Sequence, residues 1–279
     1  MNFDIDNIAI ISGSGSLPRL LSKKLTLENK NHAVVYFSED APDWISEKNV
    51  IISANFEQIG KLFDELKGRN FDKIVFAGGI KRPQINLTNA DGKFLSLSDK
   101  ILPAMKAGDD TILSLVVEIF EDEGFKILGS ENIIPSLLSE KGILTDHRPN
   151  KQDFVDIERA KNIVNAIGFV DVGQAAVVSD GVCFGIETIQ GTEKMLSFVK
   201  ETLSEYKGSS SLPIGILYKA PKPNQNLLVD FPTIGSDTIL QALDAGLNGI
   251  ALKKNGVYIL DHEKVISLAN EHKLFIIVI

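Results

Sequence analysis

The chain is poor in cysteine and in positive charge. Its single cysteine, Cys183, excludes an internal disulfide and a zinc site built from several cysteines. Cys183 sits in an apolar run, which predicts a small buried side chain and a reducing, cytoplasmic setting. Because 29 basic residues face 37 acidic ones, the net charge of -8 disfavours a nucleic-acid-binding protein. We therefore expect no nucleic-acid partner.

Long apolar runs are also missing. No run approaches the roughly 20 residues that a membrane-spanning helix needs. Residues 1–6 carry acidic side chains where a secretion signal carries basic ones. We therefore expect a soluble protein. Peripheral binding to a membrane stays open, because it requires only an apolar patch or a few lysines.

What the chain does contain is enough apolar material for two cores. Apolar residues make up 44% of the sequence and charged residues 24%, which is typical of a globular protein. A length of 279 residues exceeds what one core ordinarily organises. The polar stretch 144–153, which contains a proline, is typical of a linker. The sequence thus predicts domains at 1–148 and 149–279.

Strands alternate with amphipathic helices in the first domain. This alternation predicts an α/β fold with a Rossmann-like parallel sheet. The expected strands are 7–11, 33–37, 50–53, 73–77 and 126–128.

Glycine-rich turns follow the first and fourth of these strands, at the sheet edge where open α/β folds bind ligands. The residues that could contact a phosphate there are Gly13, Gly15, Gly78, Gly79, Lys81 and Arg82. Ligand-free tight turns with solvated cations explain the same residues. Pro18 stands where a dinucleotide-binding fingerprint has its third glycine, so an oxidoreductase reading rests on the first turn alone.

A pair of carboxylates precedes an expected helix that has apolar residues at helical spacing from Ile112 to Phe120 and ends at Gly124. Asp109 or Asp110 can cap this helix and interact with its dipole. Capping uses only one of them. The second carboxylate, near Lys106, is a candidate for substrate binding.

The second domain is predicted to be α+β with a mixed sheet. A helix is expected to begin at Asp153 or Asp156. The Asp-Gly pair at positions 180 and 181, between two apolar runs, predicts a hairpin, and the Asn-Gly pair at 255 and 256 predicts another. Gln174 and Glu187 lie at the end of the first hairpin opposite its turn. Both are poor core residues, so they are candidates for lining a site.

The segment Lys219–Gly235 can extend neither the strand expected before it nor the helix that Ser236 is expected to cap. It contains three prolines, which remove backbone donors and fix φ, so we expect an ordered loop. Lys219 and Lys222 suit phosphate charge, and Asp230, its one carboxylate, suits a divalent cation or an activated water. Hydrolysis of a phosphate anhydride needs both kinds of group.

These motifs stand in a fixed order along essentially the whole chain. They are Ile11–Pro18, Phe76–Pro83, Gly108–Asp110, Glu123–Phe125, Asp171–Gln174, Glu187, Gly191–Thr192 and Lys219–Gly235. The set resembles the LpxI-type UDP-2,3-diacylglucosamine pyrophosphatases of lipid A synthesis in Gram-negative bacteria.

The resemblance implies a two-domain enzyme that hydrolyses UDP-2,3-diacylglucosamine to UMP and 2,3-diacylglucosamine 1-phosphate. It also implies use of Mg2+, which Mn2+ could replace, with the substrate held between the domains. Asp230 corresponds to the family's essential aspartate and would be the metal ligand, with Lys219 and Lys222 on the diphosphate. The substrate-binding residues would be Gly13, Gly15, Gly78, Gly79, Lys81, Arg82, Lys106, Asp109, Asp110, Gln174, Glu187, Gly191, Thr192, Gln225, Thr233 and Gly235. The implied location is the cytoplasm, peripherally on the inner membrane, and an oligomer is compatible with this reading.

Two positions depart from the family's pattern. Asn226 stands where the family usually has an acidic residue, and Leu228 where it has an arginine. The joint change suggests the loss of one mutual salt bridge. The alternative is a non-catalytic relative that binds a UDP-sugar or lipid without turnover. Tight binding without hydrolysis would distinguish it.

Overall fold

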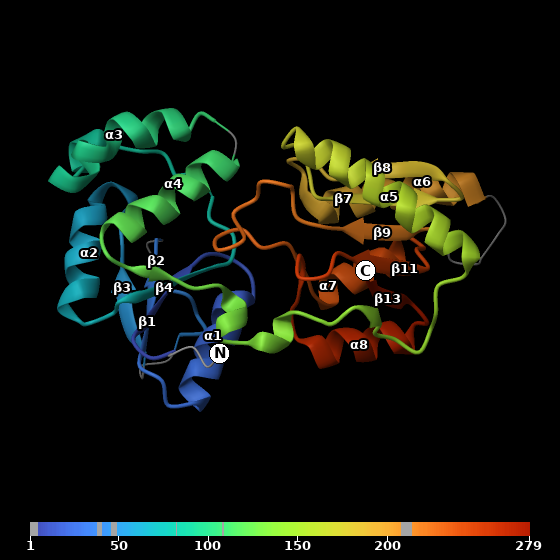
Figure 1. The fold of residues 1–279 in the computed structure, drawn as a ribbon, viewed down its shortest axis with the longest axis horizontal. Helices are drawn as coiled ribbons and strands as arrows, with labels where there is room; N and C mark the ends of the chain where they lie inside the picture. The colour runs from blue at the N-terminus through green and yellow to red at the C-terminus, as the bar shows by residue number, and fades with distance from the viewer. Residues whose placement is uncertain (1–4, 38–40, 46–48, 82, 108, 208–213) are drawn as a thin grey trace. The chain divides into compact units, whose positions relative to one another are not determined.

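The protein forms two compact units in a computed structural model that describes residues 5–37, 41–45, 49–81, 83–107, 109–207 and 214–279. The N-terminal unit comprises Met1–Pro135 and Asn226–Asp230, and the C-terminal unit comprises Ser136–Gln225 and Phe231–Ile279 (Figure 1). The boundary expected after residue 148 therefore falls inside the C-terminal unit. The reason is that Ile143 pairs with Ile277 in the sheet of that unit.

The N-terminal unit is built on a five-stranded sheet whose paired strands are all parallel, as predicted. Its strands are β1 (Ile8–Ser12), β2 (His32–Tyr36), β3 (Val50–Ser53), β4 (Lys73–Ala77) and β5 (Lys126–Ile127). The strand order is β3-β2-β1-β4-β5, so the chain reverses its direction of winding between β1 and β4. Ligands of open α/β sheets bind at such a switch point.

Helices cover both faces of this sheet (Figure 1). They are α1 (Leu17–Leu27), α2 (Ile59–Gly68), α3 (Gly92–Ala104) and α4 (Asp109–Asp122). One core cluster joins alternate strand residues such as Ala9, Val35 and Ile74 to α2, α3 and α4. Leu21 and Leu25 of α1 are fully buried, and α1 contacts β1 and β2. The period of two along the strands thus supplies apolar side chains to both faces.

The C-terminal unit has a mixed six-stranded sheet, which confirms the second half of the predicted fold class. Its strands are β6 (Gly142–Ile143), β7 (Ala175–Ser179), β8 (Val182–Ile186), β9 (Ile216–Lys219), β11 (Gly249–Leu252) and β13 (Phe275–Val278). The order is β6-β13-β11-β9-β7-β8. Strands β13, β11 and β9 are parallel, whereas β6, β7 and β8 pair antiparallel with their neighbours. A short parallel pair, β10 (Thr233–Ile234) and β12 (Tyr258–Ile259), accompanies the sheet.

Four helices pack on this sheet, α5 on one face and the other three on the opposite face (Figure 1). They are α5 (Lys151–Phe169), α6 (Gly191–Lys207), α7 (Ser236–Asp244) and α8 (His262–Glu271). No helix in the described ranges is long and apolar enough to cross a bilayer.

The hairpin with the Asp-Gly turn is confirmed, because β7 and β8 pair antiparallel around it. Asp180 and Gly181 both have positive φ, and the carboxylate of Asp156 accepts hydrogen bonds from their two amides at 3.0 and 2.7 Å. Asp156 therefore does not start α5. Asn150 caps that helix instead and forms a capping box with Asp153.

The hairpin predicted around Asn255 is wrong. Asn255 does adopt a left-handed turn conformation with φ of 55°. However, β11 pairs with β9 and β13, and β12 pairs with β10, all in parallel. The turn residue was identified correctly, but distant strands supply the pairing partners.

Smaller corrections concern burial and helix starts. Cys183 is exposed, because β8 is an edge strand whose first two residues face solvent. Gly235 occupies the cap position of α7 that was assigned to Ser236. Asp109 and Asp110 are the first two residues of α4 and so lie within its first turn.

Candidate functional site

Three side chains predicted from sequence meet at one edge of the C-terminal sheet. Lys219 is the last residue of β9, Glu187 follows the end of β8, and Thr192 is the second residue of α6. Because β7 runs antiparallel to β9, and β8 to β7, the end of β9 and the end of β8 share one edge of the sheet. The connection from β8 to α6 then brings Thr192 to the same edge.

The three side chains form a hydrogen-bonded relay in which Lys219 and Glu187 are buried and Thr192 is half-buried. The Lys219 ammonium donates a hydrogen bond to Oγ1 of Thr192 at 2.8 Å, and that hydroxyl donates to Oε2 of Glu187. The Lys219 Nζ lies 3.8 Å from the same Glu187 oxygen, and both charged side chains are only 7% exposed. Burying an ion pair costs desolvation energy that a pair of apolar residues would avoid, so stability alone does not account for it. A fixed, dehydrated cation is well suited to stabilise charge on a phosphate.

Gln174 brings an unsatisfied acceptor to this edge. It immediately precedes β7, and its main-chain oxygen accepts a hydrogen bond from the amide of Ala220 at 3.0 Å. Its side-chain Oε1 is buried and has no hydrogen-bond partner among the described residues. Since buried polar atoms are normally paired, Oε1 of Gln174 is suited to accept a hydrogen bond from a ligand or from water.

Glycine at position 173 makes this geometry possible. A Cβ on Gly173 would lie 1.8 Å from the main-chain oxygen of Glu187, a separation that no side chain permits. The loop before β7 and the loop after β8 therefore touch through their backbones. Sequence reasoning had not marked Gly173 as functional, although a glycine directly before the polar Gln174 was a visible signal.

The loop after β9 is seated on the same end of the C-terminal unit. Nζ of Lys222 donates to Oδ1 of Asp171 at 2.5 Å, and Oε1 of Gln225 accepts from the Lys222 amide at 3.0 Å. Gln225 is buried, and its side chain stabilises the loop through this hydrogen bond. Asp171 was not among the predicted site residues. The sequence signal was its place at the start of the motif Asp171–Gln174, and in the structure it adopts a positive φ of 56°.

Burial also fixes the state of the neighbouring phenol. Tyr218 precedes Lys219 on β9, and burial, with a smaller contribution from Glu158, raises its pKa to about 12. The phenol therefore stays neutral across the physiological range. It is a packing residue rather than an acid or base.

Asp230 belongs to the other unit. The five residues Asn226–Asp230 are part of the N-terminal unit, although the chain on either side belongs to the C-terminal one. The main-chain oxygen of Asn226 accepts from the amides of Val229 and Asp230, at 3.2 and 3.1 Å, and its Oδ1 accepts from the amide of Leu228 at 3.1 Å. Leu228 and Val229 pack against the N-terminal core. This turn holds Asp230 half-buried in that unit.

The chain returns to the C-terminal unit through an aromatic stack. The ring of Phe231 lies 3.7 Å from that of Tyr258, with an interplanar angle of 9°. The Pro232 oxygen accepts from the amide of Tyr258 at 2.8 Å, and Thr233 then joins β12 through β10. Thr233 and Gly235 therefore connect the loop to α7.

The two glycine turns of the N-terminal unit meet at the switch point of the sheet. The amide of Ser14 donates to the oxygen of Gly79 at 2.8 Å, and the amide of Gly79 donates back at 3.2 Å. A Cβ at Gly13 would lie 2.5 Å from the Gly79 oxygen, and Gly78 has φ of 83°. The glycines are needed for backbone contact between the turns. The amides of Ser14 and Gly79 already donate to main-chain oxygens and are not available to bind a phosphate. Phosphate binding would therefore fall to Gly15 and the start of α1.

The remaining predicted residues are spread over the N-terminal unit. Lys81 is exposed after the second glycine turn, and Arg82 lies outside the described residues. Lys106 is exposed beyond the end of α3, while Asp109 and Asp110 open α4. For Asp109 the structure describes the helical backbone and not the side chain.

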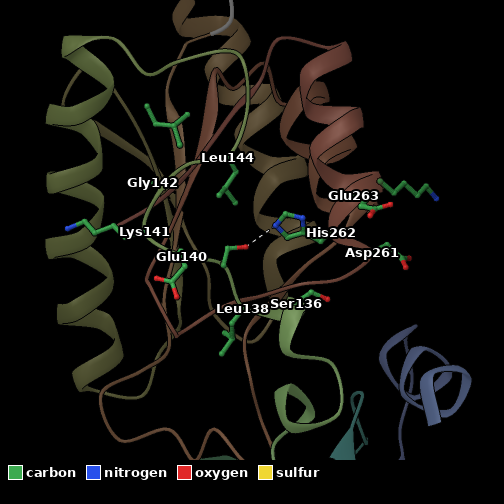
Figure 2. A pocket seen from close by; sticks show the side chains of 12 residues that line it. Ser136, Leu138, Glu140, Lys141, Gly142, Leu144, Asp261, His262 and Glu263 are labelled. Atoms are coloured by element: carbon green, nitrogen blue, oxygen red, sulfur yellow. Dashed lines mark hydrogen bonds between the residues drawn. The ribbon is translucent and has the colours of Figure 1, made fainter. Parts of the chain in front are cut away.

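A separate pocket of about 820 Å³ lies in the C-terminal unit, between the segment 136–144 and the start of α8. Figure 2 shows His262 pointing into it, joined by a hydrogen bond of 3.0 Å to Ser139. None of the residues predicted to act on a substrate lines this pocket. The relay at the end of β9 is therefore the better candidate site.

Comparison with known proteins covers both units. Residues 7–137 match the family model described as the LpxI N-terminal domain, and residues 140–277 match the LpxI C-terminal domain. The chain is 32% identical over 273 residues to the UDP-2,3-diacylglucosamine pyrophosphatase LpxI of Caulobacter vibrioides. The match includes 97% of this chain and 96% of that one.

Proposed function

The chain belongs to the LpxI family, and from this premise we propose that it hydrolyses UDP-2,3-diacylglucosamine to UMP and 2,3-diacylglucosamine 1-phosphate in lipid A synthesis. The observation that carries the proposal is the similarity over nearly the full length of both chains to a pyrophosphatase of that name. In the reaction a water oxygen forms a bond to phosphorus, the anhydride P–O bond breaks, and each product keeps one phosphate.

The relay in the C-terminal unit is assigned to the diphosphate. Lys219 would hold a fixed positive charge against the phosphate oxygens, with Thr192 and Glu187 keeping its ammonium in place. Oε1 of Gln174, buried and unpaired among the described residues, would accept a hydrogen bond from the substrate. Lys222 would contribute less charge, because Asp171 contacts its ammonium directly at 2.5 Å, whereas Glu187 lies 3.8 Å from that of Lys219.

Asp230 is proposed as the catalytic carboxylate and the ligand of Mg2+. Among the described residues no three His, Cys, Asp or Glu side chains gather as a metal centre. This fits Mg2+, which commonly takes one or two carboxylates and completes its shell with water and substrate phosphates. When bound, the ion would offset charge on the phosphate oxygens. We place the reaction in the cytoplasm, at the surface of the inner membrane.

The test is UMP release from UDP-2,3-diacylglucosamine by the purified chain with Mg2+. The wild type should release UMP, chelation of divalent ions should stop the release, and Asp230→Ala should abolish it. Asp237→Ala is a matched control, because Asp237 is a carboxylate in the first turn of α7, outside the assigned residues. No UMP release by the wild type would refute the proposal.

A further inference from the structure

Two loops of the C-terminal unit expose large apolar side chains. Phe169, at the end of α5, is 76% exposed, and Val170 and Val172 after it are 64% and 42% exposed. Ile189, between β8 and α6, is fully exposed. We call these four residues the apolar rim. Clustered exposed apolar side chains mark surfaces that contact another molecule.

The members of the rim come from loops that touch. Gly173 meets the backbone of Glu187. Val172 directly precedes Gly173, and Ile189 comes two residues after Glu187, so both lie close to that contact. A Cβ on Gly168 would lie 3.1 Å from Cδ of Pro223, which places the end of α5 against the loop after β9. The rim therefore lies beside the same end of the sheet that carries Lys219.

Charge in the rim is balanced locally. Asp171 lies within the sequence of the rim, and its carboxylate is paired with Lys222 at 2.5 Å. A paired carboxylate costs less to bring toward an apolar medium than an isolated one. Since the pair adds no net charge, attraction to anionic headgroups would contribute little, and apolar burial would be the main source of affinity.

We propose that the apolar rim inserts into the headgroup region of a lipid bilayer. The inference rests on the proposed function, because a substrate with two acyl chains resides in a bilayer while its diphosphate must reach Lys219. Rim insertion would bring the end of β9 to the level of the lipid headgroups. Apolar side chains of such interfacial segments enter the boundary between headgroups and acyl chains by about 5–10 Å.

Vesicle flotation of the full chain tests the proposal. We compare the wild type, Phe169→Ser with Ile189→Ser, and the control Phe154→Ser with Val155→Ser. Phe154 and Val155 are 48% and 57% exposed near the other end of α5. The wild type should float with substrate-free vesicles of phosphatidylethanolamine and phosphatidylglycerol. The rim variant should bind at least about tenfold more weakly, because binding scales with buried apolar area, and the control should bind like the wild type.

Three results would overturn the proposal: absence of wild-type flotation, equal flotation of the rim variant, or release of the wild type by 0.5 M salt. A change in sedimentation without a change in flotation would assign the rim to a second copy of the chain, which also overturns it. Ile189→Ser alone guards against misfolding, because this side chain is fully exposed. It should weaken flotation with an unchanged melting temperature.

A second assay separates this inference from the proposed function. UMP release is measured with substrate dispersed in detergent micelles, where no bilayer is needed. Absence of release there refutes the proposed function, whatever the flotation result. Normal release together with unaltered flotation of the rim variant refutes only the bilayer contact.

Discussion

The two sheets of this protein end in different kinds of surface. At the switch point of the N-terminal sheet, two glycine turns pair backbone to backbone, and their close approach leaves no room for side chains at positions 13 and 78. At the end of β9 in the C-terminal sheet, two buried charged side chains and a hydroxyl form a hydrogen-bonded relay. The first edge therefore offers shape and the backbone amides at Gly15 and the start of α1, whereas the second offers a positioned cation.

The largest expected effect comes from removing that cation. Lys219→Met should lower kcat/KM for UMP release by about 100- to 1000-fold, the range seen when one preorganised group that stabilises charge is lost. Lys81→Met in the N-terminal unit is the matched control, because Lys81 is an exposed cation beside a glycine turn. It should cost less than about tenfold.

Lys219→Met also leaves Glu187 buried without its cation, so the melting temperature is measured alongside activity. Lys219→Met with Glu187→Gln removes both charges and should recover stability but not turnover. A greater loss from Lys81→Met than from Lys219→Met would reverse the comparison.

Glycine substitutions probe the two edges by the same chemical change. Gly173→Ala places a Cβ 1.8 Å from a backbone oxygen, and Gly13→Ala places one 2.5 Å from another. Each should cost about 1–3 kcal/mol, or about 3–10 °C in melting temperature, with Gly173→Ala the larger. Gly68→Ala, at the end of α2 with no atom within 4 Å, is the control and should be neutral or slightly stabilising. Calorimetry that ranked all three alike would refute the close contacts.

The two unusual residues of the 226–230 turn are expected to matter less. Asn226→Asp keeps an oxygen that can accept from the Leu228 amide, so the turn should survive. Leu228→Arg gives up packing against the N-terminal core and should lower the melting temperature by about 2–4 °C. The double variant should retain kcat/KM within about fivefold. A gain above 100-fold would instead identify the natural chain as a silenced binding protein.

The smallest effect concerns a surface ion network in the N-terminal unit. Hydrogen bonds from Lys67 and Lys93 lower the pKa of Glu123 below the ordinary value of a glutamate side chain. A lowered carboxyl pKa stabilises the fold above the unfolded value and loses that effect as pH falls through the folded value. Glu123→Gln should therefore reduce the melting temperature by about 1–3 °C at pH 7. The difference from wild type should shrink as pH falls through the lowered pKa of Glu123, and a difference that stays the same across the acid range would contradict the prediction.

Local signals predicted the elements well and their pairing less well. The alternation of strands and helices gave the parallel N-terminal sheet, and the Asp-Gly turn gave the β7–β8 hairpin. The turn at Asn255 was also local, but the Lys253 amide bonds to the Lys219 oxygen and that of Lys254 to the Ile279 oxygen. These partners are far away in sequence, so no turn motif could reveal them.

The residues of the candidate site were likewise predictable one by one, whereas their contacts were not. Lys219, Glu187 and Thr192 could each be proposed from the sequence, but their contact depends on the order β9-β7-β8. The sequence also suggested that Asp230 and the two lysines form one loop. The structure distributes that loop over two units, because Leu228 and Val229 are apolar and find a core in the N-terminal one.

The 226–230 segment has a consequence for how the chain can be divided. Because a piece of the C-terminal sequence completes the packing of the N-terminal unit, the two units are not consecutive modules. A gene fragment ending near residue 135 would express an N-terminal unit without the side chains of Leu228 and Val229 on its core. Such a fragment would be prone to aggregate, and a peptide that spans residues 226–230 is the natural reagent for complementing it.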